Sequence, residues 1–474
     1  MLRSLERRSD RTNWVFWLVT FLAFLIRLAW LGRKSIWLDE VYSLGLASRE
    51  VTQIIEYITH GDSTPPLYFL MLHYILPLGQ TEFILRLPSA IFGALSVGAC
   101  YSLGRVWAGK WTGIAGAAFL AIAPIHVWYS QEARAYILAG ALGLFSVLAL
   151  SHAVISGRWF AWLGWIGATV LGLHTHYMFL IIFLVEVIVL WPACHRYGVL
   201  KRILGAVLSL VAIVLLCTPW FLSLVRVFDQ AVNSIIWYFE PVSTTLATLS
   251  IVVTKRQLFD VSLLILLFTL VILSLLGWYT VIWWWRKAFP VNKAMMVSII
   301  IFYLALLVFS AWPRGYSIRR QIAIFIPYFL LAIAWVFSNL RERNKLLIGL
   351  GSITIPLLFF QLAIVEWQDW RSVAQFMNGQ VSSQDVVLFS APWNDTTLDY
   401  YYHDSVDRFG VTPADIPVTL SRLTLGKARV WLILSGDVLS DPNGAIPVWL
   451  VSQRARLAEY GFPGIQVWLY GASP

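Results

Sequence analysis

The chain has 474 residues, of which 59% are hydrophobic and only 13% charged, and its formal net charge at pH 7 is +10. A soluble protein carries about 25% charged residues, so this composition excludes a soluble protein. The 25 tryptophans are typical of aromatic belts at two membrane interfaces. A nucleic-acid partner is also excluded, because the basic residues follow the distribution expected of membrane loops. The composition predicts an α-helical polytopic membrane protein.

Eleven apolar runs have about the length that crossing a membrane requires, although the run at 160–174 is short. They lie at 14–31, 84–104, 112–128, 136–155, 160–174, 177–191, 203–222, 258–284, 294–312, 318–338 and 346–365. The first run contains Arg27 and is long for a cleavable signal peptide, so it predicts a signal anchor. A further run, 65–79, has the length of an interfacial helix.

The basic residues orient these spans. If 65–79 is not a span and the N-terminus is cytoplasmic, nearly half of the 35 basic residues fall in the short cytoplasmic segments. This is the positive-inside pattern of membrane proteins. We therefore predict a multi-pass protein of the inner (plasma) membrane with eleven spans, a cytoplasmic N-terminus and interfacial helices in the first outer loop.

The character of the sequence changes near residue 366, which predicts a transmembrane domain over 1–365 and a small extracytoplasmic α/β domain over 366–474. Within the second domain, "SSQDVVLFSAPW", "KARVWLILSG" and "IQVWLYGAS" predict strands. "PVWLVSQRARLAEYG" predicts an amphipathic helix that ends at Gly461. This domain has no glycine-rich phosphate loop, so we expect no nucleotide there.

Two adjacent carboxylates, Asp39 and Glu40, stand in "GRKSIWLDEVYS" directly after the first span. Neighbouring residues of a helix point in different directions. We therefore expect one of them to face a substrate and the other to orient it or to pair with a cation. A carboxylate at the membrane surface could act as a general base toward a hydroxyl group. The alternative is a pair of solvated charges, or a cap, at the start of an interfacial helix.

Other polar residues of the predicted outer loops are candidates for substrate binding. His60 and Asp62 in "HGDSTPPLYFLMLHY" could bind a substrate or a metal, although a polar turn is the alternative. Tyr129, Glu132 and Arg134 in "HVWYSQEARAY" follow the third span. They could face a cleft or an outside partner, and an ordinary interfacial cluster is the alternative reading.

Three arginines, Arg314, Arg319 and Arg320 in "WPRGYSIRRQ", lie on the predicted outer side against the positive-inside pattern. An anionic partner explains them, since guanidinium groups bind phosphate oxygens in a bidentate manner. Contact with lipid headgroups is the alternative. Arg27 and Glu186 are charges inside predicted spans, so each should face the helix bundle or an edge. Arg27 could also reach the interface.

Four stretches together resemble the GT-C superfamily of integral membrane glycosyltransferases, in the branch of the protein O-mannosyltransferases and the aminoarabinose transferase. They are "IWLDE", "HGDSTPPLYFLMLHY", "TEFILRLPSAIFGAL" and "HVWYSQEARAY", in this order within about the first 140 residues. The resemblance implies a GT-C fold and a sugar donor carried on a dolichyl- or undecaprenyl-type polyprenyl phosphate. It also implies transfer on the outer side of the membrane to an acceptor that is a glycan, a lipid or a protein.

The resemblance also implies roles for particular residues. Asp39 aligns with the acidic residue taken as catalytic, and Glu40 would assist it. Glu132, the third catalytic candidate, occupies the acidic position of the second loop. Arg314, Arg319 and Arg320 fall where relatives hold the lipid phosphate. No cofactor is certain, and a divalent metal is left open.

We therefore predict a glycosyltransferase that inverts the anomeric carbon, with Asp39 as the general base. A transporter or lipid flippase is the first alternative, and it predicts charges or broken helices at the bilayer midplane. A sensor or scaffold that reads an outer ligand through the C-terminal domain is the second alternative.

Overall fold

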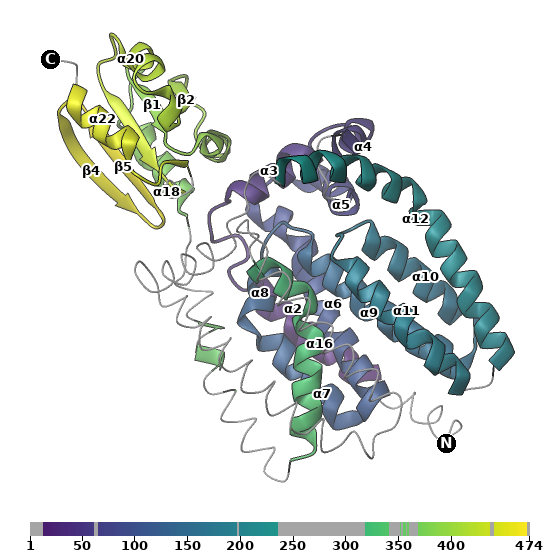
Figure 1. Ribbon diagram of the computed structural model, residues 1–474. Coiled ribbons are helices and arrows are strands. Elements are labelled where there is room, and N and C mark those ends of the chain that lie inside the picture. The colour runs from purple at the N-terminus through teal and green to yellow at the C-terminus, as the bar shows by residue number, and fades with distance from the viewer. Residues whose placement is uncertain are drawn as a thin grey trace. The chain divides into compact units, whose positions relative to one another are not determined.

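The computed structural model describes residues 13–60, 65–196, 199–235, 318–340, 351, 354–356, 358–359, 368–436 and 440–471 (Figure 1). The chain forms two compact units. The first comprises Met1–Ala29, Arg49–Tyr74 and Leu87–Gln361, and the second comprises Trp30–Ser48, Ile75–Arg86 and Leu362–Pro474. The second unit therefore combines the C-terminal part of the chain with two short segments from near the N-terminus.

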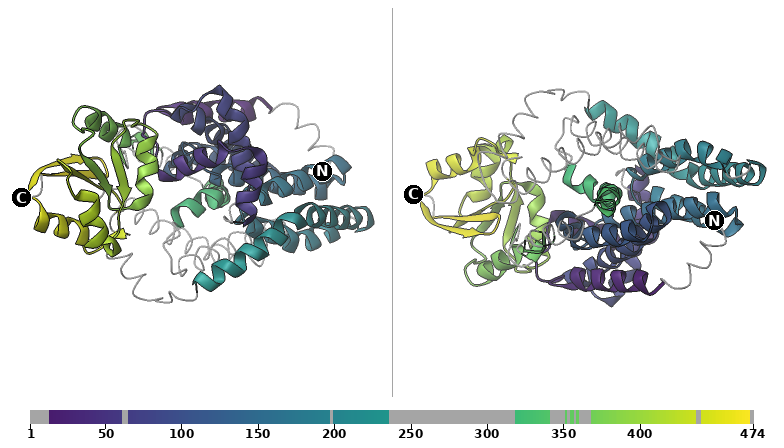
Figure 2. Two further views of the ribbon diagram at one scale, coloured as in Figure 1. Left: turned by 90° about the horizontal axis from the view of Figure 1, so that it is seen from above. Right: turned by 90° about the horizontal axis from the view of Figure 1, so that it is seen from below.

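The first unit is built of helices in its described part. They are α2 (Asn13–Leu28), α4 (Val51–His60), α5 (Leu67–Ile75), α6 (Glu82–Ala108), α7 (Lys110–Ile122), α8 (Pro124–Tyr129), α9 (Tyr136–Ser156), α10 (Trp159–Leu173), α11 (Phe179–Arg196), α12 (Val199–Ile235) and α16 (Ile318–Ser338). The first residues of α6, up to Arg86, belong to the second unit. Helix α9 packs against α10, α11 and α16, while α12 packs against α10 and α11 (Figures 1 and 2). Helix α7 packs against α2 and α16.

Three helices in the described ranges are long and apolar enough to cross a membrane, namely Glu82–Ala108, Tyr136–Ser156 and Leu200–Leu222. Shorter apolar helices coincide with five more of the predicted spans and with the predicted interfacial helix; they are Trp14–Leu28, Lys110–Ile122, Trp159–Leu173, Phe179–Ile188, Ala323–Ser338 and Leu67–Leu78. The predicted spans 258–284 and 294–312, and most of 346–365, lie outside the described residues. The number of eleven spans therefore stays a prediction.

The third predicted span, 112–128, was wrong as a single helix. Helix α7 ends at Ile122, and α8 begins at Pro124 after Ala123 adopts an extended conformation. Proline lacks the backbone N–H that would continue the helical ladder and clashes with the preceding turn. The break places the short helix α8 at the start of the "HVWYSQEARAY" stretch, which carries several of the candidate residues.

The second unit contains a five-stranded sheet in the order β2-β1-β3-β5-β4. Strand β1 (Val386–Phe389) is parallel to β2 (Asp407–Gly410) and β3 (Val430–Leu434), whereas β5 (Ile465–Tyr470) is antiparallel to β3 and β4 (Arg456–Phe462). The other elements of this unit are α3 (Leu38–Ala47), α18 (Trp370–Asn378), α19 (Asp395–Asp399), α20 (Val418–Thr424), α22 (Ala445–Gln453) and the 3-10 helices η1 (Leu76–Leu78), η3 (Pro392–Asn394) and η4 (Pro413–Asp415).

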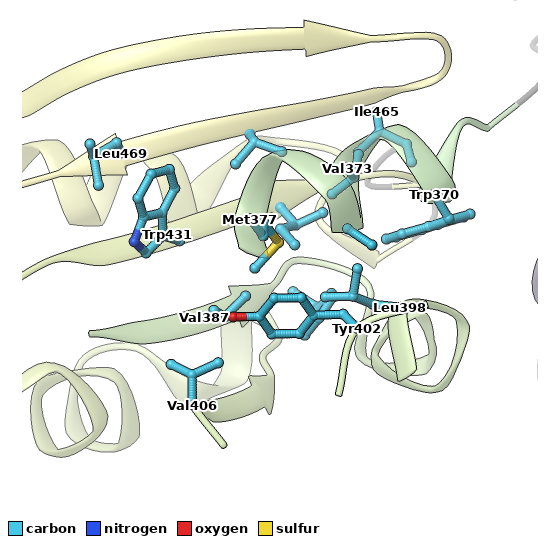
Figure 3. Close-up of a cluster of buried hydrophobic side chains, with 14 residues drawn as sticks. Trp370, Val373, Met377, Val387, Leu398, Tyr402, Val406, Trp431, Ile465 and Leu469 are labelled. Atoms are coloured by element: carbon cyan, nitrogen blue, oxygen red, sulfur yellow. The ribbon is translucent and has the colours of Figure 1, made fainter. Parts of the chain in front are cut away.

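Helices bury both faces of this sheet, as expected for an α/β domain. On one face Trp370 and Met377 of α18 are buried with Trp431 of β3 and with Tyr402 (Figure 3). On the other face Leu420 of α20 and two residues of α22 pack against the alternate residues of β1 and β3. The predicted C-terminal α/β domain is confirmed in its fold.

The three strands predicted in this domain are confirmed as β1, β3 and β5, but the helix predicted to end at Gly461 was wrong in its second half. Helix α22 ends at Gln453, and Arg456–Phe462 form strand β4. Ala458, Tyr460 and Phe462 alternate along β4 and pack against the core. Pairing with β5 and this period of two outweigh the helical pattern of the same residues.

Candidate functional site

Asp39 and Glu40 lie in the first turn of α3, in the second unit. The helix begins after Trp37, whose backbone is extended, and the carbonyl oxygen of Trp37 accepts hydrogen bonds from the N–H groups of Glu40 and Val41. Carboxylates in the first turn interact favourably with the helix dipole, which helps this short helix to start here. The two acids therefore stand directly after an irregular segment, residues 30–37.

Glu40 forms a buried ion pair with Arg86 of α6. Arg86 Nε donates to Glu40 Oε1 and Arg86 Nη2 to Glu40 Oε2, each at 2.7 Å. The two residues are only 1% and 3% exposed. A bidentate pair of this kind holds both side chains in one geometry. Of the two adjacent carboxylates, Glu40 is therefore the one that pairs with a cation.

Arg86 was not among the site residues predicted from the sequence. The signal was present, because Arg86 stands near one end of an apolar helix, where a buried charge requires a partner. It also follows Glu82 by one helical turn, and Glu82 is a second residue that was missed. Glu82 accepts hydrogen bonds from Arg371 and Tyr401, which belong to the C-terminal part of the same unit.

Tyr129, Glu132 and Arg134 lie in the first unit, between α8 and α9 or at the end of α8. Glu132 is buried, and its Oε1 accepts a hydrogen bond of 2.6 Å from Trp128 Nε1. The Arg134 guanidinium lies 5.8 Å from the centre of the Tyr136 ring, and the Tyr129 ring meets the same ring edge-on. The backbone N–H of Glu132 donates to the carbonyl oxygen of Tyr129 at 3.4 Å, and that of Arg134 donates to the carbonyl oxygen of Glu132 at 2.9 Å, so the three predicted residues belong to one local cluster.

Arg27 forms hydrogen bonds with the loop between α8 and α9, which belongs to the same unit. It is fully buried, and its Nε donates to Ser130 Oγ at 3.2 Å. Its Nη1 donates to the carbonyl oxygen of Ala23 at 2.9 Å, and Gln131 Nε2 donates to the carbonyl oxygen of Arg27 at 3.0 Å. The expectation that Arg27 faces the bundle is confirmed.

Two other buried polar residues face the helix bundle. Glu186 accepts hydrogen bonds from Ser146 Oγ at 2.6 Å and from Trp165 Nε1 at 3.0 Å, so it faces the interior as expected. His176 packs against the Tyr136 ring, and its Nδ1 accepts from the backbone N–H of Met178. Burial, and secondly the charge of Arg134, lower the pKa of His176 to about 3, so this imidazole is neutral at physiological pH.

The remaining predicted residues are described only in part. His60 is the last residue of α4, and the backbones of Arg319 and Arg320 lie in the first turn of α16. Asp62 and Arg314 lie outside the described residues. In the described part of the chain, no three His, Cys, Asp or Glu side chains are grouped closely enough to hold a metal ion.

Residues 63–222 match the family model of the dolichyl-phosphate-mannose-protein mannosyltransferases. A search of the curated proteins found no match. Among solved structures, ArnT from Cupriavidus metallidurans in the apo state is 14% identical, with a TM-score of 0.58 over 98% of this chain and 99% of that one. The same ArnT bound to undecaprenyl phosphate gives a TM-score of 0.55 over 98% of this chain and 100% of that one, at 14% identity.

The archaeal oligosaccharyltransferase AglB from Archaeoglobus fulgidus, in complex with an inhibitory peptide and a dolichol-phosphate, has a TM-score of 0.56 at 13% identity. That match covers 97% of this chain and 74% of AglB. These identities are low, so the structural matches concern the fold. The resemblance seen in the first part of the sequence is confirmed: residues 63–222 match a mannosyltransferase family model, and nearly the whole chain shares its fold with ArnT and AglB.

Proposed function

We propose that this chain is a membrane glycosyltransferase that moves a sugar from a polyprenyl-phosphate lipid to an acceptor on the outer side of the inner membrane. The observation that carries the proposal is the match of residues 63–222 to a mannosyltransferase family model within a fold shared over nearly the full length of ArnT. The solved relatives were captured with undecaprenyl phosphate and with dolichol-phosphate. Those ligands support a polyprenyl phosphate as the donor's carrier here.

Asp39 is the proposed general base. Glu40 is committed to Arg86 through both of its oxygens, so of the two adjacent acids Asp39 is the better candidate for proton transfer. The acceptor hydroxyl gives its proton to the Asp39 carboxylate while its oxygen bonds to the anomeric carbon. The bond from that carbon to the phosphate oxygen breaks, and the phosphate leaves with the bonding electrons. A single displacement inverts the anomeric carbon.

The leaving phosphate develops negative charge, and preorganised positive groups stabilise such charge. Arg314, Arg319 and Arg320 are proposed for this role. Glu132, Tyr129 and Arg134 form the local cluster described above, and they are proposed to contact the substrate together with His60 and Asp62. The proposed orientation follows the positive-inside pattern, with the N-terminus cytoplasmic and the C-terminal domain outside.

Mass spectrometry of the envelope glycans tests this function. A strain that lacks the gene should lose one glycan modification, and the wild-type chain supplied on a plasmid should restore it. The variant Asp404→Asn removes an exposed carboxylate of the C-terminal domain and should restore it equally. An unchanged glycan profile in the deletion strain, together with lipid counterflow by the purified chain in proteoliposomes, would instead support a flippase.

A further inference from the structure

In the irregular segment that leads into α3, every backbone carbonyl oxygen from residue 31 to residue 35 accepts a hydrogen bond from an arginine side chain. Arg86 of α6 donates to three of these carbonyl oxygens. Its Nη1 donates to the oxygens of Leu31 at 3.1 Å and of Lys34 at 2.8 Å, and its Nη2 donates to the oxygen of Ser35 at 3.0 Å. Backbone groups away from water need such partners. Arg86 thereby uses the N–H donors that its ion pair with Glu40 leaves available.

Arg371 of α18 donates to the two remaining carbonyl oxygens, those of residues 32 and 33. Its Nη1 donates to the oxygen of Arg33 at 2.8 Å, and its Nη2 donates to that of Gly32 at 3.3 Å. Its backbone N–H also donates to Ser35 Oγ at 3.2 Å. The C-terminal domain thus supplies direct hydrogen bonds to a segment more than 300 residues earlier in the chain.

Tyr401 contacts the same segment at Ile36, the last residue before the N-cap of α3. The backbone N–H of Ile36 donates to the Tyr401 hydroxyl at 2.7 Å, and this hydroxyl in turn donates to Glu82 Oε1. Burial, and secondly the hydrogen bond to Glu82, raise the pKa of Tyr401, so the hydroxyl keeps its proton and donates at neutral pH. Glu82 also accepts from Arg371 and therefore joins the two C-terminal side chains.

The held segment, residues 31–36, leads directly into α3, and Asp39 stands three residues after Ile36. Fixing Ile36 fixes the direction in which α3 starts, because Trp37 is its N-cap. We propose that Arg371 and Tyr401 are positioning residues, through which the C-terminal domain sets the orientation of Asp39. This inference rests on the proposed function, in which Asp39 is the base. The C-terminal domain is then part of the catalytic apparatus and is more than a separate module for an acceptor.

Substitutions that spare the core of the C-terminal domain test the proposal. Tyr401→Phe removes one hydroxyl, and Arg371→Ala removes the guanidinium. A misplacement of about 1 Å can lower a rate about 100-fold. We expect each variant to restore the missing glycan modification about 10- to 100-fold more slowly than the wild type, while the purified variant binds undecaprenyl phosphate with unchanged affinity. Arg371→Lys cannot reproduce the forked contacts and should fall between Arg371→Ala and the wild type.

Two matched controls separate positioning from general damage. Tyr402→Phe removes the hydroxyl of the adjacent tyrosine, which packs in the core of the C-terminal domain, and Arg408→Ala breaks an ion pair with Asp399 inside that domain. Both should restore the modification at the wild-type rate. If they slow it as much as Tyr401→Phe and Arg371→Ala do, the effect is a general loss of the domain and the proposal is wrong.

Hydrogen–deuterium exchange of the full chain in nanodiscs gives a readout that does not depend on activity. In Tyr401→Phe and Arg371→Ala, the amides of residues 32–44 should exchange several-fold faster than in the wild type and in the two controls. Unchanged exchange in that segment would overturn the inference whatever the activity. If exchange changes as expected but the deletion strain has an unchanged glycan profile, the proposed function fails and the hold on residues 31–36 stands.

Discussion

Arg86 and Arg371 together donate hydrogen bonds to five successive backbone carbonyl oxygens, those of residues 31–35. The two arginines lie 285 positions apart in the sequence. Each is also paired with a carboxylate, Arg86 with Glu40 and Arg371 with Glu82. An irregular segment is thereby ordered without a helix or a strand of its own. Since α3 begins where this segment ends, the geometry of Asp39 depends on contacts that are remote in sequence.

The buried pair of Glu40 and Arg86 should be costly to break from one side. Removing one partner leaves an uncompensated buried charge, which costs about 3–5 kcal/mol. Arg86→Met should therefore lower the free energy of unfolding in detergent micelles by about this amount. The double variant Glu40→Leu with Arg86→Met removes both charges and should be more stable than Arg86→Met alone. A double variant that is less stable than Arg86→Met would contradict this account of the pair.

Gly93 of α6 allows the close approach of Arg27 and Ser130. A Cβ at this position would lie 2.2 Å from Ser130 Oγ and 2.8 Å from Arg27 Nε. Gly93→Ala should lower the free energy of unfolding by about 1–3 kcal/mol, as overpacked sites do. Gly167→Ala in α10 is the matched control, because a Cβ there meets nothing within 4 Å. It should be neutral or stabilise by about 0.5–1 kcal/mol, and similar losses in both variants would refute the prediction.

The stability of the C-terminal domain should fall in acid because of Asp385. Burial alone would raise the pKa of this carboxyl, but the hydrogen bonds from Arg429, from the backbone of Ser382 and from Trp431 together hold its pKa below the ordinary value of 3.8. A depressed pKa contributes stability above the unfolded-state value, and the contribution disappears as the pH falls through the folded-state value.

Thermal unfolding of the full chain at several pH values measures this contribution. Asp385→Asn should unfold at a lower temperature than the wild type at pH 7. The difference should begin to shrink below about pH 4, where the carboxyl of the unfolded chain becomes protonated, and should vanish once the pH falls below the folded-state pKa. Asp404→Asn, at an exposed position, should unfold like the wild type at every pH measured. A difference that stays constant into acid would show that charge on Asp385 is not its source.

Local patterns in the sequence predicted much of the fold. The apolar runs around Val386, Val430 and Ile465 are short and bounded by polar residues, and each became a strand. The "RARLAEYG" stretch carries both a helical and a strand period, so only its pairing with β5 decided between them. Pro124 was visible in the sequence, but the apolar run on either side of it concealed the break between α7 and α8.

The candidate site was less accessible to sequence analysis, because its contacts join distant positions. Asp39 and Glu40 were identified from their place after the first span, but Arg86, the ion-pair partner of Glu40, lies 46 residues further along the chain. Arg371 and Tyr401 lie in a domain that the sequence analysis separated from these acids at residue 366. Periodicity and motif spacing describe neighbours along the chain. They indicate that a buried charge such as Arg86 needs a partner, but they do not identify which distant residue that partner is.

The most direct test of the account compares turnover and donor binding in the purified Asp39→Asn variant. A general base contributes about 100- to 10,000-fold to a rate, so transfer from the polyprenyl-phosphate sugar extracted from the source membranes should fall by at least about 100-fold. Binding of undecaprenyl phosphate should stay at the wild-type level, since the amide keeps the size of the side chain. Transfer at a near-normal rate by this variant would contradict the assignment of Asp39 as the base.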